Sequence, residues 1–257
     1  MRNNKPYVLI TGANGGIGQA LVLEFLEHGY KIIATDIGNC SVIDSPEIHY
    51  LSMDLNQFAI DSDYADNFIK IVQQIVDDKE LKALINNAAV QILGSCEEIT
   101  REQWQKTLNI NLSAPFFLSQ ALLPLLEKAK GSIVNISSIH AQLTKKEFVA
   151  YATSKGALSS LTRNMAVDLG AKVRVNAIEP AAIETEMLKL SFAKEPEKLD
   201  QLSDFHPSGN IGKPNKLAEL VRNILEMSIN DSFLQGSIIQ FNGGISNCLS
   251  DPDRSTS

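Results

Sequence analysis

The chain has 257 residues, of which 44% are hydrophobic and 21% are charged. This is the composition of an ordinary globular protein and excludes wholesale disorder. Its 30 acidic side chains outnumber the 23 basic ones and give a net charge of −7, which argues against a nucleic-acid partner, because such binding depends on clustered basic residues. A chain of this length can bury a core without disulfides or a structural metal, and we expect no metal site.

The cysteines and the N-terminal sequence indicate in which cellular compartment the protein is expected. Cys40, Cys96 and Cys248 are odd in number and far apart, so we expect reduced thiols. The apolar run at 7–10 is too short for a signal-peptide core, and no stretch approaches the roughly 18 apolar residues of a membrane span. We therefore expect a cytoplasmic protein with no membrane partner.

Short β-branched runs alternate with longer segments of helical period along the chain. We predict strands at 7–11, 31–36, 48–53, 83–86, 132–137, 174–178 and 237–241, and helices at 17–28, 64–76, 101–129, 154–169 and 215–227. Several strands are apolar at nearly every position, which is typical of a sheet covered on both faces. The alternation predicts an α/β protein with a Rossmann-type, doubly wound parallel sheet of about seven strands, in a single domain over 1–245.

One interval interrupts this rhythm. Residues 184–214 carry many charges, two interior prolines and little periodicity. Long irregular insertions in compact domains are commonly lids or binding loops, so we interpret this one as a substrate-side lid that contains short helices. Residues 246–257 have the polar composition of a frayed tail.

A glycine-rich turn, Thr11-Gly12-Ala13-Asn14-Gly15-Gly16-Ile17-Gly18, follows the first predicted strand. Glycines let the backbone turn sharply and approach a pyrophosphate, and the next helix offers unpaired N–H groups and the positive end of its dipole. The glycine spacing is not GxGxxG, and a plain strand-to-helix turn is the alternative. The strand–turn–helix context favours a dinucleotide site.

Asp36 ends the second predicted strand, 18 residues after Gly18. A carboxylate about 20 residues beyond such a turn can accept hydrogen bonds from the adenosine ribose, and it would repel a 2′-phosphate. The neighbouring residues offer no cation to such a phosphate: Ala13, Asn14, Ile37 and Gly38. The pattern thus predicts NAD rather than NADP as cofactor, the alternative being that Asp36 is a solvated strand end.

Four further motifs follow in order: Asn86-Asn87-Ala88-Ala89, Leu108-Asn109-Ile110-Asn111-Leu112, Asn135-Ile136-Ser137-Ser138 and Tyr151-Ala152-Thr153-Ser154-Lys155. With the glycine turn, they resemble the motifs of the short-chain dehydrogenase/reductase family over nearly the whole chain. Ala89 replaces the last glycine of the family's Asn-Asn-Ala-Gly element, and Pro180-Ala181 replaces its Pro-Gly. The resemblance implies an oxidoreductase that transfers a hydride between a nicotinamide dinucleotide and a secondary alcohol or ketone, and a homodimer or homotetramer.

The resemblance also implies residue roles. Tyr151 would be the general acid/base, Lys155 would stabilise its phenolate, Ser138 would hold the substrate oxygen, and Asn111 would hold a water that relays protons. The cofactor would be bound by Gly12, Asn14, Gly15, Gly16, Ile17, Gly18, Asp36, Asp54, Leu55, Asn87, Ala88, Tyr151, Lys155, Pro180, Ile183 and Thr185. For Asp54 and Thr185 the alternatives are a turn cap and a helix cap.

The residue types suit this chemistry. Oxidising an alcohol removes a proton from oxygen as well as a hydride from carbon. A free phenol titrates near ~10. An ammonium one helical turn away, at the spacing of Tyr151 and Lys155, and the positive charge of oxidised nicotinamide together stabilise the phenolate. Such a pair is otherwise a packing face, and a serine at a strand end is otherwise a turn former. Their occurrence beside a dinucleotide turn favours catalysis.

The substrate side gives weaker signals. Gln91 and His140 resemble the polar anchors of 3-hydroxybutyrate dehydrogenases in the same family, but Phe148 stands where those enzymes carry a basic residue, and His140 alternatively is a plain loop residue. The substrate is therefore left as a small molecule, a sugar or a hydroxy acid. We hypothesise that Glu179, an acid near the mouth of the site, favours polyhydroxylated or amino-bearing substrates.

Two other functions compete with a NAD-dependent enzyme. A catalytically silent dinucleotide sensor or scaffold needs the glycine turn but not the serine, tyrosine, lysine and asparagine set. An NADP-dependent biosynthetic ketoreductase would share that set, and Asp36 argues against it.

Overall fold

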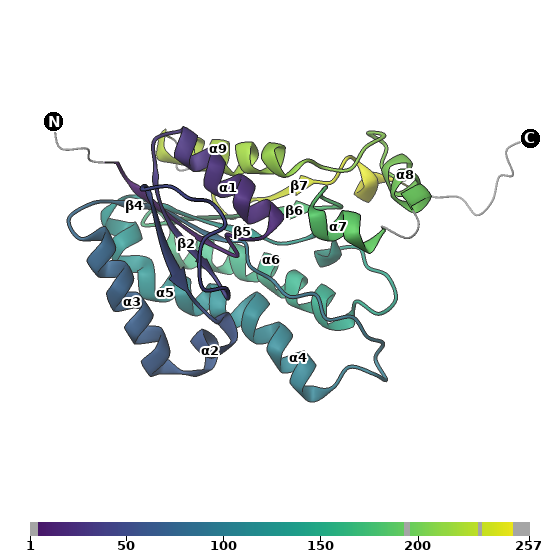
Figure 1. Cartoon of the computed structure of the whole chain (residues 1–257), viewed down its shortest axis with the longest axis horizontal. Coiled ribbons are helices and arrows are strands. Elements are labelled where there is room, and N and C mark those ends of the chain that lie inside the picture. The colour runs from purple at the N-terminus through teal and green to yellow at the C-terminus, as the bar shows by residue number, and fades with distance from the viewer. Residues whose placement is uncertain (1–4, 193–195, 231–232, 249–257) are drawn as a thin grey trace, which may run out of the picture.

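The computed structural model describes residues 5–192, 196–230 and 233–248, and the strands in this part of the chain form one seven-stranded parallel sheet (Figure 1). The sheet order is β3-β2-β1-β4-β5-β6-β7. The strands are β1 (Tyr7–Thr11), β2 (Lys31–Asp36), β3 (Ile48–Ser52), β4 (Leu81–Asn86), β5 (Ser132–Ile136), β6 (Arg174–Pro180) and β7 (Ile238–Phe241). The predicted fold class is confirmed, and the order reverses between β1 and β4, where open α/β sheets bind ligands.

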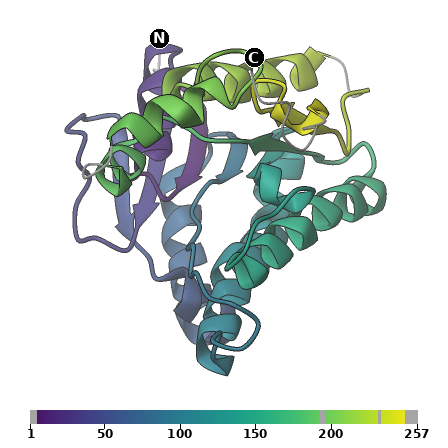
Figure 2. The same ribbon diagram turned by 90° about the vertical axis from the view of Figure 1, so that its right-hand side faces the viewer.

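Helices cover both faces of the sheet, and Figures 1 and 2 show the resulting three layers. One face carries α1 (Gly16–Glu27) and α9 (Pro214–Asn230), and the other carries α3 (Ser62–Val76), α5 (Ala114–Lys128) and α6 (Val149–Leu169). Successive residues of β1 enter opposite cores: Val8 and Ile10 pack under α1 and α9, and Leu9 packs on the α3 side. Burial on both faces explains why the strands are apolar throughout.

The helix expected over 101–129 is three segments. These are α4 (Arg101–Leu108), a π-helical turn at Asn109–Ser113 and α5. The wide turn lies where the Asn111 side chain bonds Val90 instead of pointing to solvent. The helix expected from residue 154 begins earlier, at Val149, and thus includes Tyr151. A short helix that we did not predict, α2 (Leu55–Ile60), follows β3.

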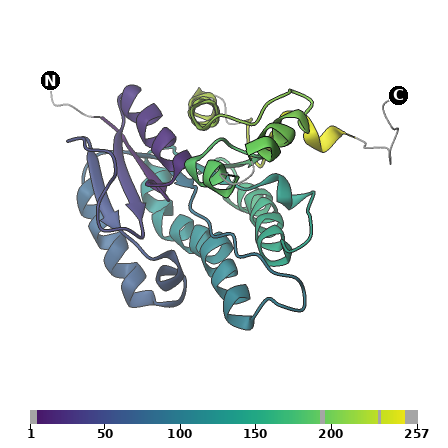
Figure 3. The same cartoon turned by 45° about the vertical axis from the view of Figure 1, so that its right-hand side comes forward.

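The predicted lid contains two short helices, α7 (Glu186–Ser191) and α8 (Pro196–Asp204). Both lie toward the carboxyl ends of the strands (Figures 1 and 3). Ile183 and Gly212 pair as an isolated bridge that closes the base of this segment. Its movement as a lid stays a prediction.

The tail predicted from residue 246 is in part ordered. Asn242 donates a hydrogen bond of 2.7 Å to the Ser246 hydroxyl, which lies 3.0 Å from Gln240 Oε1, so Ser246 is held against the end of β7. Residues 249–257 lie outside the described part of the chain.

The described residues contain neither a membrane-spanning helix nor a cluster of metal-binding side chains. No helix there is both long and apolar enough to cross a bilayer. Nor does that part hold three or more His, Cys, Asp or Glu side chains grouped to bind a metal ion. The three cysteines are free and exposed.

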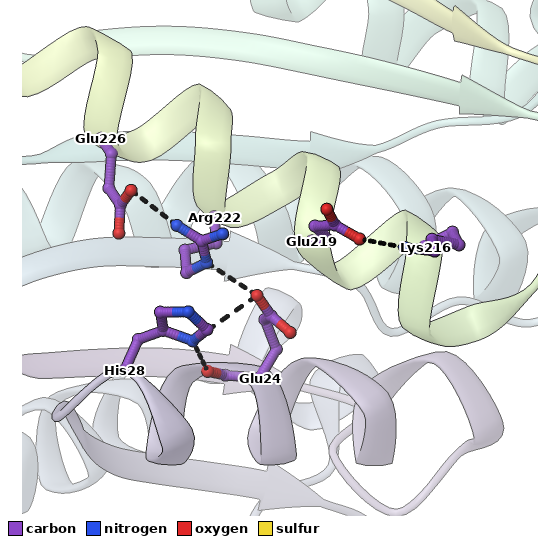
Figure 4. A network of polar contacts seen from close by, with 6 residues as sticks. All are labelled: Glu24, His28, Lys216, Glu219, Arg222 and Glu226. Atoms are coloured by element: carbon purple, nitrogen blue, oxygen red, sulfur yellow. Dashed lines mark hydrogen bonds and ion pairs between the residues drawn. The ribbon is translucent and has the colours of Figure 1, made fainter.

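A polar network joins α1 to α9 (Figure 4). Arg222 Nε on α9 lies 2.7 Å from Glu24 Oε1 on α1, and Arg222 Nη1 lies 2.6 Å from Glu226 Oε2. The side chains of Arg222 and Glu24 are only 14% and 15% exposed, so water replaces a lost partner poorly there.

We expect Arg222→Met to lower the free energy of unfolding by about 1–2 kcal/mol, because it leaves the shielded Glu24 carboxylate without its charged donor. Lys216→Met is the matched control on the same helix: its pair with Glu219 is 63% and 43% exposed, and we expect a loss below about 0.5 kcal/mol. Urea unfolding measures both. Equal losses in the two variants would show that burial of the Arg222 pair adds nothing.

Candidate active site

The glycine turn between β1 and α1 has no room for a Cβ at Gly12, Gly16 or Gly18. Gly12 has a φ of +66°, and a Cβ there would lie 2.8 Å from Ala88 Cα. A Cβ on Gly18 would collide with the Gly12 carbonyl oxygen, and one on Gly16 would lie 2.9 Å from Thr185 Cβ. The N-cap of α1, Gly15, has no side chain to cap the first helical turn. The first turn of α1 therefore has no side-chain cap, and its N–H groups, at the positive end of the helix dipole, fit a pyrophosphate.

The end of β4 is tied to this turn. Thr11 Oγ1 accepts hydrogen bonds of 3.0 Å from the backbone N–H groups of Asn87 and Ala88. Asn87 Nδ2 donates to the carbonyl oxygens of Thr11 and Gly12, at 2.9 and 3.1 Å. The structure thus brings Asn87 and Ala88 beside the glycines, as a shared cofactor site requires.

Asp36 is held in a fixed orientation at the end of β2. Its Oδ2 accepts a 3.0 Å hydrogen bond from the Asn14 backbone N–H, and its Oδ1 accepts one of 2.8 Å from Ile37 N–H. The Asn14 side chain donates to the Cys40 carbonyl oxygen and to the Tyr50 hydroxyl. The carboxylate predicted to bind the adenosine ribose therefore lies next to the glycine turn.

The other expected cofactor residues divide into two groups. Asp54 caps α2 by accepting from Asn56 N–H, and Thr185 accepts a 3.3 Å bond from Leu188 N–H at the start of α7, so both alternative cap roles are present. Leu55, Pro180 and Ile183 are buried at the carboxyl side of the sheet. Cofactor contacts by these five residues stay predictions.

Ser138, Tyr151 and Lys155 meet where β5 ends against α6. Lys155 is 2% exposed, and its Nζ donates a 2.7 Å hydrogen bond to the Ile136 carbonyl oxygen and lies 5.8 Å from the centre of the Tyr151 ring. Ser138 is 6% exposed, its Oγ accepts a 3.2 Å bond from His140 N–H, and its hydroxyl forms a hydrogen bond with Tyr151. The three predicted side chains are thus brought together.

The protonation of this pair differs from the expectation. Burial raises the pKa of Tyr151 above the ordinary value of a phenol, and a hydrogen bond with Ser138 opposes this only in part. Burial also lowers the pKa of Lys155 to about 7, so at neutral pH the ammonium is only partly formed. The protein's own groups therefore do not make Tyr151 more acidic, and its use as a base requires further positive charge in the crevice.

Asn111 is fully buried in the π-helical turn and both ends of its amide are engaged. Its Oδ1 accepts from Val90 N–H at 2.8 Å, and its Nδ2 donates to the Val90 carbonyl and, at 3.0 Å, to Ser154 Oγ. Ser154 in turn donates to the Tyr151 carbonyl oxygen. Asn111 thus joins the loop after β4 to the catalytic turn of α6, and its expected hold on a water stays a prediction.

The two residues expected on the substrate side, His140 and Gln91, differ in their surroundings. His140 stacks on Phe148 with ring centres 4.4 Å apart and meets the Tyr151 ring edge-on at 5.9 Å. Burial lowers the pKa of His140, so its ring is neutral at physiological pH. Gln91 is exposed. His140 therefore stands in the wall of the site, and a substrate contact by either residue stays a prediction.

Glu179 does not face the mouth of the site as we hypothesised. It is 2% exposed, and its two oxygens accept 2.7 Å hydrogen bonds from Ser159 Oγ and Gln142 Nε2. Sequence reasoning missed Ser159 as part of this site. The spacing in the sequence could have indicated it, because Tyr151, Lys155 and Ser159 are four residues apart and therefore share one face of a helix.

Comparisons with known proteins agree with this geometry. A family model described as "short chain dehydrogenase" matches residues 6–196. The chain is 31% identical over 251 residues to the 3-oxoacyl-[acyl-carrier-protein] reductase FabG of Thermotoga maritima, covering 95% of this chain and 99% of that protein.

Solved structures match over nearly the full length. The ligand-free aldohexose dehydrogenase of Thermoplasma acidophilum has a TM-score of 0.86 at 27% identity and covers 98% of both chains. ElxO with NADP bound (TM-score 0.84, 26% identity) and 4-hydroxyisoleucine dehydrogenase complexed with NADH (TM-score 0.82, 28% identity) each cover 95% of this chain and all of theirs.

Proposed function

The chain belongs to the short-chain dehydrogenase family, and on that premise we propose that it is a NAD-dependent oxidoreductase that interconverts a secondary alcohol and a ketone. The observation that carries the proposal is the convergence of Ser138, Tyr151 and Lys155 between β5 and α6, at the same sheet edge as the glycine turn. A silent sensor or scaffold would need the turn alone, so this convergence favours an enzyme.

Each of the three side chains has a definable task. When bound, the nicotinamide accepts or supplies the hydride. Tyr151 Oη takes the proton from the substrate hydroxyl, or returns it to a carbonyl oxygen in the reverse direction. With substrate bound, Ser138 donates its hydroxyl proton to the substrate oxygen and holds that oxygen against Tyr151. The charged form of Lys155 stabilises the Tyr151 phenolate.

For the substrate, we propose a polar molecule such as a sugar or a hydroxy acid. The similarity to an aldohexose dehydrogenase and to a 4-hydroxyisoleucine dehydrogenase supports this class, while the similarity to a 3-oxoacyl reductase supports the biosynthetic alternative. A turnover screen of sugars, hydroxy acids and 3-oxoacyl thioesters with both nucleotides, read as absorbance of the reduced nicotinamide, tests it. Turnover of the thioesters alone would replace the proposal with the alternative.

The preference for NAD rests on the orientation of Asp36. Both oxygens of its carboxylate accept backbone N–H groups and keep lone pairs for ribose hydroxyls, and a 2′-phosphate would meet this negative charge.

We expect kcat/KM of the wild type to be at least about 100-fold higher with NAD than with NADP. With NADP, the charged hydrogen bond from the ribose to Asp36 is lost, and the 2′-phosphate is repelled by the Asp36 carboxylate. Asp36→Ala should lower kcat/KM with NAD about tenfold and thereby reduce the preference for NAD over NADP. Asp44 is an exposed carboxylate in the same segment, and Asp44→Ala should leave this preference unchanged. A wild-type protein that prefers NADP would show that Asp36 does not select the cofactor.

We further propose that the protein is cytoplasmic and forms a homodimer or homotetramer through α5 and α6. Exposed apolar side chains on these helices support this assembly: Phe117 is 42% exposed and Val167 is 85% exposed. Light scattering measures the mass in solution, and a monomer at micromolar concentration would contradict the assembly.

A further inference from the structure

Glu179 is a buried carboxylate for which the proposed chemistry has no use. It is 2% exposed, it lies near the end of β6, and the two side chains that donate hydrogen bonds to it, Gln142 and Ser159, are neutral. Burying a carboxyl group costs free energy unless hydrogen bonds offset it, and Glu179 accepts two such bonds, each of 2.7 Å. These bonds lead to the two ends of the segment that carries Ser138.

One bond reaches the residue before Ser138. Ser159 Oγ donates to Glu179 Oε1 and lies 2.8 Å from Ser137 Oγ. The single Ser137 hydroxyl proton can be donated to Ser159 Oγ or to the Lys155 carbonyl oxygen, which lies 3.0 Å from Ser137 Oγ. Glu179 is thus connected through two hydroxyls to the peptide that precedes the catalytic serine and to the backbone of the catalytic lysine.

The other bond reaches the far end of the same segment. Ser138 begins a single 3₁₀ turn, Ile139–Ala141, and Gln142 follows it as the C-cap residue. Gln142 Nε2 donates to Glu179 Oε2, although Gln142 is otherwise exposed. A turn this short has little stability of its own, so its position depends on what holds its ends.

We propose that Glu179 is a positioning residue that fixes the segment 138–142 against α6 and so holds the Ser138 hydroxyl at the substrate oxygen. The expected effect of Glu179 on turnover rests on the proposed function. Its expected effect on the segment 138–142 rests on the hydrogen-bond network alone. Because a displacement of about 1 Å at a reacting group costs up to about 100-fold in rate, we expect Glu179→Ala to lower kcat by about 10–100-fold.

The shape of the side chain should matter more than its charge. In Glu179→Gln, the amide oxygen still accepts from Ser159, and the amide N–H₂ donates to Gln142 once the Gln142 amide is turned over. We expect this variant to keep kcat within about threefold of wild type. Equal loss in the alanine and glutamine variants would overturn positioning in favour of a role for the charge.

Two readouts separate positioning from general weakening of the fold. NADH affinity, measured by fluorescence titration, should change much less than kcat in Glu179→Ala, because the glycine turn after β1 and Asp36 at the end of β2 lie outside the hydrogen-bond network of Glu179. Asn176→Ala is the matched control: Asn176 is fully buried on the same strand and hydrogen-bonded to Leu234 and Ser237, so it should lower the melting temperature while kcat holds. A fall in kcat of equal size in the control would overturn the inference.

Amide hydrogen exchange tests the segment without any substrate. We expect peptides that cover 138–142 to exchange faster in Glu179→Ala than in wild type or Asn176→Ala, and Glu179→Gln to restore protection. Unchanged exchange would overturn the inference even if the enzyme is active. Faster exchange in a protein that turns over no alcohol or ketone would support the positioning role and contradict the proposed function instead.

Discussion

Tyr151→Phe should reduce turnover by about 10³-fold, within the range of about 10²–10⁴ that general acid–base catalysis contributes. The substitution removes only the hydroxyl that carries the substrate proton. The ring keeps its edge-on contacts with His140 and Phe148, at 5.9 and 6.1 Å, so the wall of the site is preserved. NADH affinity should therefore stay within about threefold of wild type.

The control for this variant is Tyr7→Phe. The Tyr7 hydroxyl lies 3.3 Å from His49 Nε2, at the amino-terminal end of the sheet and away from the glycine turn. It should leave kcat unchanged, as measured by steady-state kinetics beside nucleotide titration. If Tyr151→Phe retained turnover, proton transfer would have to pass through another group, and the assignment of the general acid/base would be wrong.

The elements that could be read from the sequence are those with strong local patterns. β1 and β2 match their predicted bounds because each is a run of apolar residues that ends at a turn or a charge. The glycine turn, the serine at the end of β5 and the tyrosine–lysine pair are short motifs whose order along the chain fixes their meeting point in a parallel sheet. The convergence of Ser138 and Lys155 followed from this order.

The features that the sequence did not reveal depend on contacts between distant residues. The π-helical turn at Asn109–Ser113 accompanies the bonds from Asn111 to the backbone of Val90, and nothing within 101–129 announces it. The direction of the Glu179 side chain likewise depends on Gln142 and Ser159, which lie on other elements. The same holds for the pKa of Lys155, because the spacing of Tyr151 and Lys155 specifies their proximity but not their desolvation.

That desolvation gives a second large effect, on stability. Below pH 7 Lys155 is charged in both the folded and the unfolded chain, and the folded state bears the full cost of burying the charge. Between about pH 7, its folded pKa, and pH 10.5, its unfolded value, the unfolded chain binds more protons than the folded one. Stability from this group therefore rises with pH across that window, with a slope of up to about 1.4 kcal/mol per pH unit.

Lys155→Met isolates this contribution, because methionine fills a similar volume without a charge. In nucleotide-free protein at pH 6 to 7 we expect the variant to be as stable as wild type or more so, since the 2.7 Å bond to Ile136 offsets only part of the burial cost. Between pH 7 and pH 9 the free energy of unfolding of the wild type should rise, relative to that of the variant, by about 1 kcal/mol or more, as measured by urea unfolding at each pH. Parallel stability curves for the two proteins would mean that the lysine titrates near its ordinary pKa, and hence that the crevice is wetter than the packing of β5 against α6 implies.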